Sequence, residues 1–554
     1  MKQGARPGSA QGQPKTEAIG GRDPAAERIA ANFAAFEQRV RQAQDHYARG
    51  NREAAAVDAA LAAHVATGTH CGIFWSPRLE RLLNAIGRQL DDDVTSTSGR
   101  QPTQRYQNVL HVCTEVHQSG GLTNMISRWI KADRSRTYSI ALTQHRGPMP
   151  EHLSAAVAKS GGKLHHINHH IGGLFAWARS LRRVARQYDV IVLHIYCEDV
   201  IPMLAFAEPE NVPPVLLLNH ADHLFWFGPS ISHAVINLRD AAKDLAASRR
   251  GIAPERNLLM PTIVDPTIRT RSRSEAKRSL GFDPERTLLV SVARATKYRT
   301  INGVTYADRH VPLLRKHPNA ELVVVGAGEP EDWGPAIAAA GGRIRPLANQ
   351  SDPRPYYEAA DIYVDSYPFV SSTSLMEAAG YGVPLVSIFT APDDARIFGI
   401  NHVGLVGTAL VATSDAEYNE MLTRLVVDEA FRHERGEAAR EAIARMHAPP
   451  GWLTYLEAIY ARSMELPPLD NQRMLKGDDE EQPSFGEPDR RHEDMFRSHF
   501  PLSGALKGFM GMVPARQQWA YWNELRRDGA FDNGWQAASY LLPEWLKRVL
   551  KDRH

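Results

Sequence analysis

With 554 residues, the chain is too long for a single hydrophobic core and should divide into two or three domains. Its hydrophobic content of 43% and charged content of 23% are typical of soluble globular proteins. The formal net charge of +2 provides no broad basic surface for a polyanion, so nucleic acid is not an expected partner.

Three cysteines, Cys71, Cys113 and Cys197, are widely separated and show neither paired nor metal-ligand spacing. This pattern indicates a reducing compartment and no structural zinc. No apolar run reaches the ~20 residues that span a bilayer, and the N-terminus lacks the apolar segment of a signal peptide. A cytoplasmic protein is therefore expected.

The N-terminal part is predicted to contain a disordered segment and a helical domain. Residues 1–24 are rich in Gly, Pro and Gln and have little to bury, which predicts disorder. In residues 25–95 apolar side chains recur at helical spacing, which predicts a small helical domain. Asp91, Asp92 and Asp93 imitate a metal-binding triplet, but their place in a polar linker favours a solvated turn.

Two series of apolar strand candidates alternate with helical stretches. The first series comprises 107–114, 138–143, 189–196, 214–219 and 233–238. The second comprises 286–294, 320–328, 341–348, 360–366 and 383–389. Continuous Val/Ile/Leu strands between helices indicate parallel sheets covered on both faces. The sequence therefore predicts an α/β fold with two Rossmann-like doubly wound domains, 104–270 and 271–465, and a ligand cleft between them.

The C-terminal part is predicted to be a linker and a helical tail. Residues 466–491 are acidic and contain prolines, as linkers do. The tail, 492–554, contains four of the ten tryptophans, Trp519, Trp522, Trp535 and Trp545. Either it lies at the inner face of a membrane as a peripheral contact, or it packs on the core; aromatic residues at helical spacing favour packing.

The first candidate for ligand binding is a glycine pair. Gly120 and Gly121 follow the predicted strand 107–114 and precede an amphipathic helix. Paired glycines let backbone N–H groups approach a phosphate or sugar at a helix start. An ordinary tight turn is the other interpretation, since the G-x-G-x-x-G spacing is missing.

The second candidate is a histidine–aspartate group after the strand 214–219. His220, Asp222 and His223 crowd the carboxyl end of this strand. A histidine beside an aspartate can act as a base or donate to a sugar hydroxyl, although such histidines also cap loop backbone. We expect only a surface loop for another histidine group, which has no nearby carboxylate, His165, His166, His169 and His170.

The third and fourth candidates lie in the second predicted domain. Arg294 and Lys297 follow the strand 286–294, where a diphosphate needs cations, with Arg299 as a substitute. Ser372, Thr373 and Ser374 begin a short helix, whose free N–H groups and hydroxyls can hold a phosphate, and Glu377 one turn later can accept ribose hydroxyls. A basic surface turn and an ordinary N-cap are the structural alternatives.

The order of these parts over residues 105–465 resembles the GT-B glycosyltransferases, which use nucleotide-sugar donors. The segment "ADIYVDSYPFVSSTSLMEAAGYGVPLVS" looks most like two relatives, the retaining family with an E-x7-E motif and the O-GlcNAc transferase-like family with a D-x-F-P-x-x-x-x-T-T-x-x-E pattern. The first Glu of E-x7-E falls on Phe369. The second pattern fits better, at Asp365, Tyr367, Pro368 and Thr373. Whether the transfer retains or inverts the configuration at the anomeric carbon stays open.

The resemblance implies roles for individual residues. Glu377 corresponds to the ribose ligand, the residues before it contact the donor diphosphate, and backbone near Leu347 and Ala348 meets the nucleobase. The implied reaction transfers a sugar from a nucleoside diphosphate sugar, with a UDP-sugar as the expected donor and no other cofactor. The acceptor is a hydroxyl of a glycan, a lipid-linked glycan or a protein, in glycan or surface polysaccharide synthesis or in protein glycosylation.

In this reaction His220 orients the sugar or takes the acceptor proton, with Asp222 and His223 as alternates. The two cations and the helix start stabilise the leaving diphosphate, so no metal is required. Two other functions stay open. A sugar-nucleotide epimerase is disfavoured because no clear acid–base pair is visible, whereas Phe369 favours a catalytically silent binding subunit.

Overall fold

The computed structural model describes residues 23–90, 105–118, 120–476, 480–495 and 502–542. Most of the segment for which disorder is predicted, residues 1–22, lies outside the described residues. The triplet 91–93 and Trp545 lie outside them as well.

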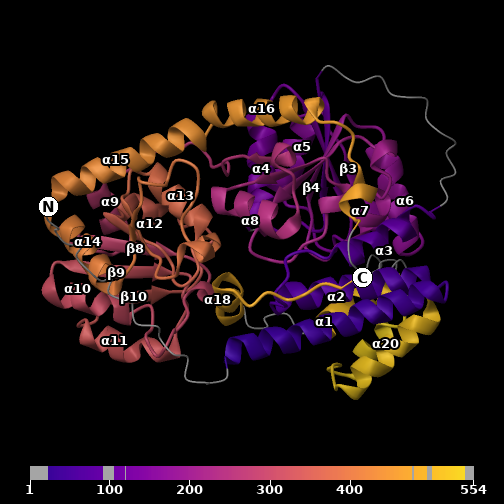
Figure 1. Ribbon diagram of the computed structural model, residues 1–554. Helices are drawn as coiled ribbons and strands as arrows, with labels where there is room; N and C mark the ends of the chain where they lie inside the picture. The colour runs from indigo at the N-terminus through magenta and orange to yellow at the C-terminus, as the bar shows by residue number, and fades with distance from the viewer. Residues whose placement is uncertain (1–22, 91–104, 119, 477–479, 496–501, 543–554) are drawn as a thin grey trace, which may run out of the picture.

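Two parallel sheets form the framework of the two lobes seen in Figure 1. The first sheet has the order β3-β2-β1-β4-β5-β6-β7, with β1 Asn108–Cys113, β2 Thr137–Leu142, β3 Leu164–His166, β4 Val190–His194, β5 Val215–Asn219, β6 Ala234–Asn237 and β7 Asn257–Leu259. The second has the order β10-β9-β8-β11-β12-β13, with β8 Thr287–Val292, β9 Ala320–Val325, β10 Ile344–Leu347, β11 Ile362–Val364, β12 Leu385–Ile388 and β13 Leu410–Ala412. The predicted pair of doubly wound domains is confirmed.

The ten predicted strands are all present, but three short strands are additional. β3, β7 and β13 have three residues each and carry partly exposed side chains, so they lack the apolar run that marks a buried strand. The surface loop predicted at His165 and His166 is wrong, because both lie in β3 at the edge of the first sheet. There His165 Nε2 lies 2.7 Å from the Tyr188 hydroxyl.

Helices cover both faces of each sheet (Figure 1). Those of the first lobe are α4 Gly121–Ala132, α5 Glu151–Lys159, α6 Leu174–Ala185, α7 Val200–Ala205, α8 Asp240–Arg250 and α16 Gly451–Glu465. Those of the second are α9 Arg273–Ser279, α10 Val311–Lys316, α11 Gly334–Ala339, α12 Arg354–Ala359, α13 Ser372–Gly380, α14 Asp415–Val427 and α15 Glu429–Met446. Alternate residues of β1 show the layering, since Leu110 and Val112 pack into one core cluster and Val109 into the cluster on the other face.

The N-terminal helices and the tail extend the first lobe. The helices α1 Pro24–Ala48, α2 Arg52–Gly68 and α3 Pro77–Gly87 share a core cluster with the first sheet. The tail contains α19 Leu502–Phe509, α20 Ala515–Arg527 and α21 Gly534–Ser539, after α17 Asn471–Met474 and α18 Glu487–Met495. Phe509, Tyr521 and Leu525 are buried in the same cluster, so the described tail packs on the core, while Trp519 and Trp535 stay exposed.

The chain crosses twice between the lobes, and the crossings are bonded to each other. The first crossing follows β7, and the second joins α15 to α16. The ring of His447 at the second crossing lies 2.8 Å from the Thr262 carbonyl oxygen and 2.7 Å from that of Val403. Nearby, Trp452 is fully buried and its Nε1 donates to the Pro261 carbonyl at 2.7 Å. The two crossings therefore behave as one connection.

Across the described residues, every helix is too short or too polar to span a bilayer.

Replacing Trp452 by alanine should lower the free energy of unfolding by about 3–5 kcal/mol, because a fully buried indole leaves a cavity and an unpaired carbonyl. Trp535→Ala provides the matched control. Its side chain is 84% exposed, so its effect should stay within about 0.5 kcal/mol. Urea unfolding followed by circular dichroism measures both, and equal effects would contradict the packing described for α16.

Candidate active site

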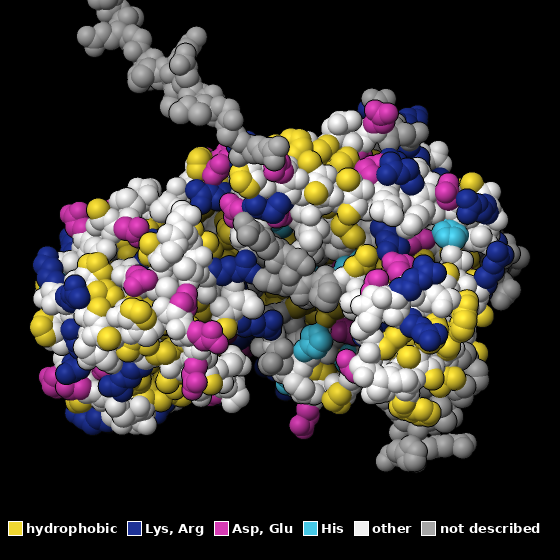
Figure 2. All heavy atoms as spheres, turned by 90° about the horizontal axis from the view of Figure 1, so that it is seen from below, with side chains coloured by type: hydrophobic (Ala, Val, Ile, Leu, Met, Phe, Trp, Pro, Cys, Tyr) yellow, Lys and Arg dark blue, Asp and Glu magenta, His cyan; other side chains and the backbone are white. Residues whose placement is uncertain are grey.

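Each sheet contains a point at which its strand order reverses. β1 lies between β2 and β4, and β8 lies between β9 and β11. Ligands of open α/β sheets bind outside the carboxyl ends of the strands at such points. Gly120 follows β1, Lys297 follows β8 and Ser372 follows β11, so the predicted motifs sit at the two reversals. Figure 2 shows the molecule hollowed between its lobes, with Lys, Arg and His side chains gathered along the hollow.

The start of α13 is held by a buried carboxylate. Asp365, which directly follows β11, accepts hydrogen bonds from the backbone N–H groups of Ser366 and Ser371, both at 2.9 Å. Ser387 Oγ lies 3.3 Å from its other oxygen. Burial raises the pKa of Asp365 to about 6, although these bonds and Lys297 favour the charged form. The loop before α13 is thereby folded back on its own carboxylate.

The first turn of α13 is left without a side-chain cap. Ser371 is the N-cap residue, and its side chain makes no capping hydrogen bond to the helix. Its hydroxyl instead donates to Ser374 Oγ at 3.2 Å. Residues 372–374 are therefore the first helical residues, and their N–H groups lie where a helix binds anions.

Lys297 lies beside this helix start. Its Nζ donates to the carbonyl oxygen of Val370 at 2.8 Å and lies 4.8 Å from the centre of the Phe369 ring. Burial lowers the pKa of Lys297 to about 8, with smaller contributions from Arg239 and Arg294 and an opposing one from Asp365. The ammonium therefore keeps most of its charge at neutral pH. Arg294, Lys297 and residues 372–374 are together called the cradle below.

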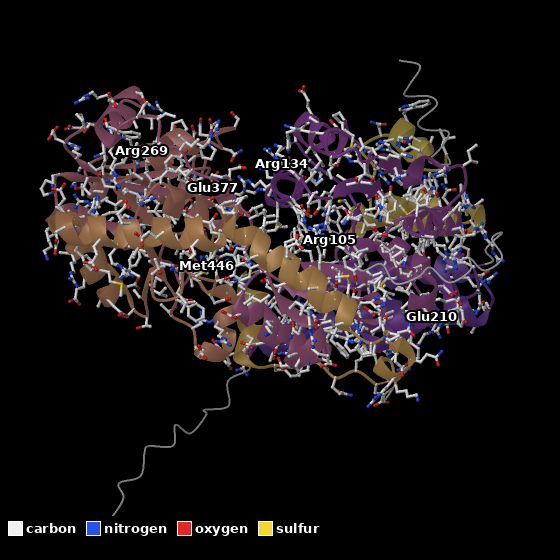
Figure 3. The ribbon with its side chains drawn as sticks, turned by 90° about the horizontal axis from the view of Figure 1, so that it is seen from above. Arg105, Arg134, Glu210, Arg269, Glu377 and Met446 are labelled. Carbon is white, nitrogen blue, oxygen red and sulfur yellow. The ribbon has the colours of Figure 1, made fainter. Side chains whose placement is uncertain are left out.

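Glu377 faces the first lobe. Arg128 of α4 donates from Nη2 to Glu377 Oε1 at 2.8 Å and from Nε to Asp265 Oδ2 at 2.8 Å. Figure 3 shows Glu377 on the side of its lobe that is turned to Arg134 in the other lobe. The candidate ribose ligand thus lies at the lobe boundary, paired with an arginine from the opposite lobe.

The glycine pair approaches α13 from the first lobe. A Cβ atom added to Gly121 would lie 3.5 Å from Thr373 Oγ1. Gly120 has a φ of 147°, a conformation that other residues rarely adopt, and the space beside it is open. The structure therefore brings the glycine pair and the hydroxyls of α13 to opposite sides of one narrow space.

Asp222 forms a buried ion pair. Arg239 donates to both of its carboxylate oxygens, from Nε at 2.6 Å and from Nη2 at 2.7 Å. Burial alone would raise the pKa of Asp222, but Arg239 and His223 hold it well below its usual range. The Nδ1 atom of His223 lies 3.2 Å from the same carboxylate.

The two candidate histidines occupy different places. His223 lies at the lobe boundary, with its ring centre 4.9 Å from that of Phe369. His220 lies in the first lobe, where Nδ1 is 3.3 Å from the Leu218 carbonyl oxygen and the residue lines a cavity of only about 10 Å³. Burial lowers the pKa of both histidines. Of the two, His223 has the contact with the second lobe.

Leu347 and Ala348 lie at the end of β10, beside the turn that follows β9. The N–H groups of Gly326 and Gly328 both donate to the Leu347 carbonyl oxygen, at 2.9 and 3.0 Å. The Ala348 carbonyl accepts from Gln350 at 3.2 Å. The role expected for this backbone in binding a nucleobase stays a prediction.

Three residues at the site were not found from the sequence. Arg128 lies in the middle of α4, where no sequence signal marks it. Arg239 follows β6, and its position after a predicted strand is the only signal that could have indicated it. His492 belongs to α18, which Figure 1 shows between the lobes. Its ring centre lies 4.2 Å from that of His70 and 6.3 Å from that of His223. No periodic or spacing signal in the sequence indicates this contact.

The part of the chain that the structure describes contains no group of three or more His, Cys, Asp or Glu side chains arranged to hold a metal ion.

Residues 286–427 match the family model described as "Glycosyl transferases group 1". The matched range runs from the start of β8 to the end of α14 and contains the cradle and Glu377. The predicted resemblance to GT-B glycosyltransferases is therefore confirmed, and the match supports sugar transfer in general. No curated protein matches the sequence.

Several solved structures are similar in fold. An O-GlcNAc transferase of Thermobaculum terrenum has 15% identity, covers 80% of this chain and 85% of its own, and gives a TM-score of 0.46. A glycosyltransferase from Rickettsia africae has 14% identity and a TM-score of 0.49; the alignment covers 66% of this chain and 100% of the Rickettsia chain. Anabaena HepE, solved in complex with UDP and glucose, has 14% identity and a TM-score of 0.47; the alignment covers 63% of this chain and 97% of the HepE chain.

Replacing Arg239 by methionine should lower the free energy of unfolding by about 3–5 kcal/mol, because the buried Asp222 carboxylate would lose its counterion. The ion pair stabilises the fold above the unfolded pKa of Asp222, and this contribution is lost as pH falls through the lower folded value. The double variant Arg239→Met, Asp222→Asn removes both charges and should recover part of the loss. Urea unfolding at pH 7 tests this, and no recovery in the double variant would contradict the pairing.

Proposed function

We propose that the protein transfers a sugar from a nucleoside diphosphate sugar to an acceptor hydroxyl. One observation carries the proposal: Lys297 lies beside an uncapped helix start at a strand-order reversal, facing the glycine pair of the other lobe, and Arg294 precedes it by three residues. Such an arrangement fits a diphosphate, which needs both cations and N–H donors. A UDP-sugar is the donor that we propose first.

The cradle lowers the barrier by acting on the leaving group. When the bond between the sugar and the diphosphate breaks, negative charge grows on the diphosphate. Lys297, held beside the N–H groups of α13, lies ready to stabilise that charge without reorganising. Because Lys297 and Arg294 supply this positive charge, we propose that no metal ion takes part.

Glu377 is proposed to bind the ribose. In the structure it shares Arg128 with Asp265, at 2.8 Å in each case. When ribose hydroxyls donate to Glu377, Asp265 can still hold Arg128. The arginine therefore keeps a partner, and its contact with the second lobe can be exchanged for the donor at modest cost.

His223 is the base that we propose for the acceptor hydroxyl, with His220 nearby to orient the sugar. Asp222 stays ionised and favours the tautomer of His223 with the proton on Nδ1, which makes Nε2 the basic nitrogen of the ring. Burial lowers the pKa of His223, which keeps the ring neutral at pH 7.

We propose a glycan, a lipid-linked glycan or a protein as the acceptor, because the N-terminal helices and the tail enlarge the first lobe beyond its sheet. The three cysteines are free and buried, which fits work in a reducing cytoplasm. Contact with the inner face of a membrane would use the exposed Trp519 and Trp535.

One observation favours a catalytically silent binding subunit as the second candidate. The Phe369 ring lies 4.8 Å from Lys297 Nζ and 4.9 Å from the His223 ring centre. An aromatic side chain thus stands between the proposed base and the proposed cation. Such a protein would bind the nucleotide sugar without turnover.

Replacing Lys297 by alanine should lower turnover at least tenfold, about 1.4 kcal/mol in the barrier, because the leaving diphosphate loses its cation. Release of nucleoside diphosphate from a panel of UDP-, GDP- and TDP-sugars measures this. Lys316→Ala, an exposed lysine of the same lobe, is the matched control and should leave the rate unchanged. Donor binding in calorimetry without any release would favour the silent subunit, and an unchanged rate in Lys297→Ala would remove this residue from the site.

The rate should fall in acid as His223 becomes protonated, with a midpoint below the usual 6.5 because burial lowers its pKa. Profiles of kcat/KM between pH 4.5 and 8 test this for the wild type. The value of kcat/KM should fall about 10²–10⁴-fold in His223→Ala, and its decrease at acid pH should disappear. His220→Ala is the matched comparison, and it should lower the rate less and keep the limb; the reverse pattern would assign the base to His220.

A further inference from the structure

A basin of about 580 Å³ opens on the second lobe, separate from the cradle. It lies where the first crossing between the lobes passes the C-terminal end of α13 and the middle of α15. Its lining includes Thr267, Arg269, Arg273, Tyr381, His433 and Arg440, together with one carboxylate, Glu437. The helical part of the cradle begins at Ser372, and the basin reaches Gly380 at the other end of α13. These two residues are roughly 12 Å apart along the helix axis. Figure 3 shows Arg269 farther from the first lobe than Glu377.

Two arginines of the basin are held in place by backbone carbonyls. Arg269 donates to the carbonyl oxygens of Glu358 at 2.7 Å and Tyr381 at 3.0 Å. Arg273 donates to those of Ala360 at 3.2 Å and Gly382 at 2.9 Å. A guanidinium group has five N–H donors, so each arginine has more donors than these two bonds use. Because these acceptors are backbone atoms near the ends of α12 and α13, the two cations are positioned before any ligand binds.

Neither arginine is neutralised by direct contact with a carboxylate of the described chain, although the charges of Glu358 and Asp361 act on Arg269 and Arg273 acts on Glu437. Among the described residues, no Asp or Glu forms an ion pair with Arg269 or Arg273, whereas Arg440 pairs with Glu437 at 2.7 Å. Burial lowers the pKa of Arg269, and the neighbouring charge of Arg273 lowers it further. Two like charges are therefore held close together, and an anion between them would relieve their repulsion.

We propose that this basin binds a small organic phosphate. Oxyanions match the forked donors of arginine, and each such contact is charge-assisted. The volume lies within the ~300–1,000 Å³ typical of sites for small organic ligands and exceeds what a bare phosphate ion would fill. Tyr381 and His433 provide further polar groups at the wall. The binding does not depend on sugar transfer, so it can be tested separately from the proposed function.

The basin also touches the first crossing and the helix α15, which leads into the second. Thr267 and Arg269 belong to the first crossing, and Arg440 belongs to α15. A phosphate bound between Arg269 and Arg440 would therefore join the first crossing to α15. Because such a ligand binds only the folded chain, it should also raise the unfolding temperature.

Calorimetry and thermal unfolding of the full chain with glucose 1-phosphate test the proposal, with glucose and inorganic phosphate as the other ligands. We expect saturable binding and a raised unfolding temperature with glucose 1-phosphate, weaker binding of inorganic phosphate, and none of glucose. Arg269→Gln should weaken the binding at least tenfold. Arg440→Gln should weaken it too, and because the Arg440 side chain is exposed this variant should keep the fold.

Two further variants identify the place of binding. Lys297→Ala alters the cradle and should leave the affinity unchanged, as should Arg278→Gln, an exposed arginine of α9 outside the basin lining. Loss of binding in Lys297→Ala but not in Arg269→Gln would place the phosphate in the cradle and overturn the proposal. Equal affinity for inorganic phosphate, or no binding at all, would overturn it as well.

Discussion

The hydrogen bonds that Asp365 accepts from the N–H groups of Ser366 and Ser371 are the constraint on which the site depends. They turn the chain at the end of β11 so that α13 begins at Ser372 with its first turn toward the other lobe. The same turn places the Val370 carbonyl where Lys297 Nζ can donate to it. Without this carboxylate, the loop that positions both the start of α13 and the Lys297 ammonium would not be fixed.

Burial acts on the charges of the site in opposite directions. It lowers the pKa of Lys297 to about 8 and raises that of Asp365 to about 6, so each group is drawn toward its neutral form. Their mutual attraction opposes both shifts, and near pH 7 both are mostly charged. A diphosphate would add negative charge next to Lys297 and Arg294, which favours the charged ammonium further. The site is thus prepared electrostatically for an anion before one binds.

Most of the framework could be predicted from the sequence, because its signals are local. The ten predicted strands are apolar runs between helices, and residues in the loops that follow them, such as Lys297 and His223, lie near strand ends by connectivity alone. The roles of Arg128 and Arg239 could not be predicted, because their partners Glu377 and Asp222 are distant in sequence or reached through a turn. Such pairings depend on how the lobes meet, and no periodicity encodes that.

The helix α18 shows what the lobe boundary requires beyond the two sheets. Glu493 accepts from Arg28 at 2.9 Å, and Asp489 Oδ1 lies 2.8 Å from His70 Nε2, so the helix is fixed to the first lobe by ionic contacts. Its last residue, Met495, belongs to an apolar cluster that contains Phe398 of the second lobe and Ala241 of α8 in the first. Any opening of the lobes on this side must separate that apolar contact, whereas the ionic contacts can stay. His492 lies between these contacts, with its ring centre 6.3 Å from that of His223, so a separation of the lobes here would also change the surroundings of the proposed base.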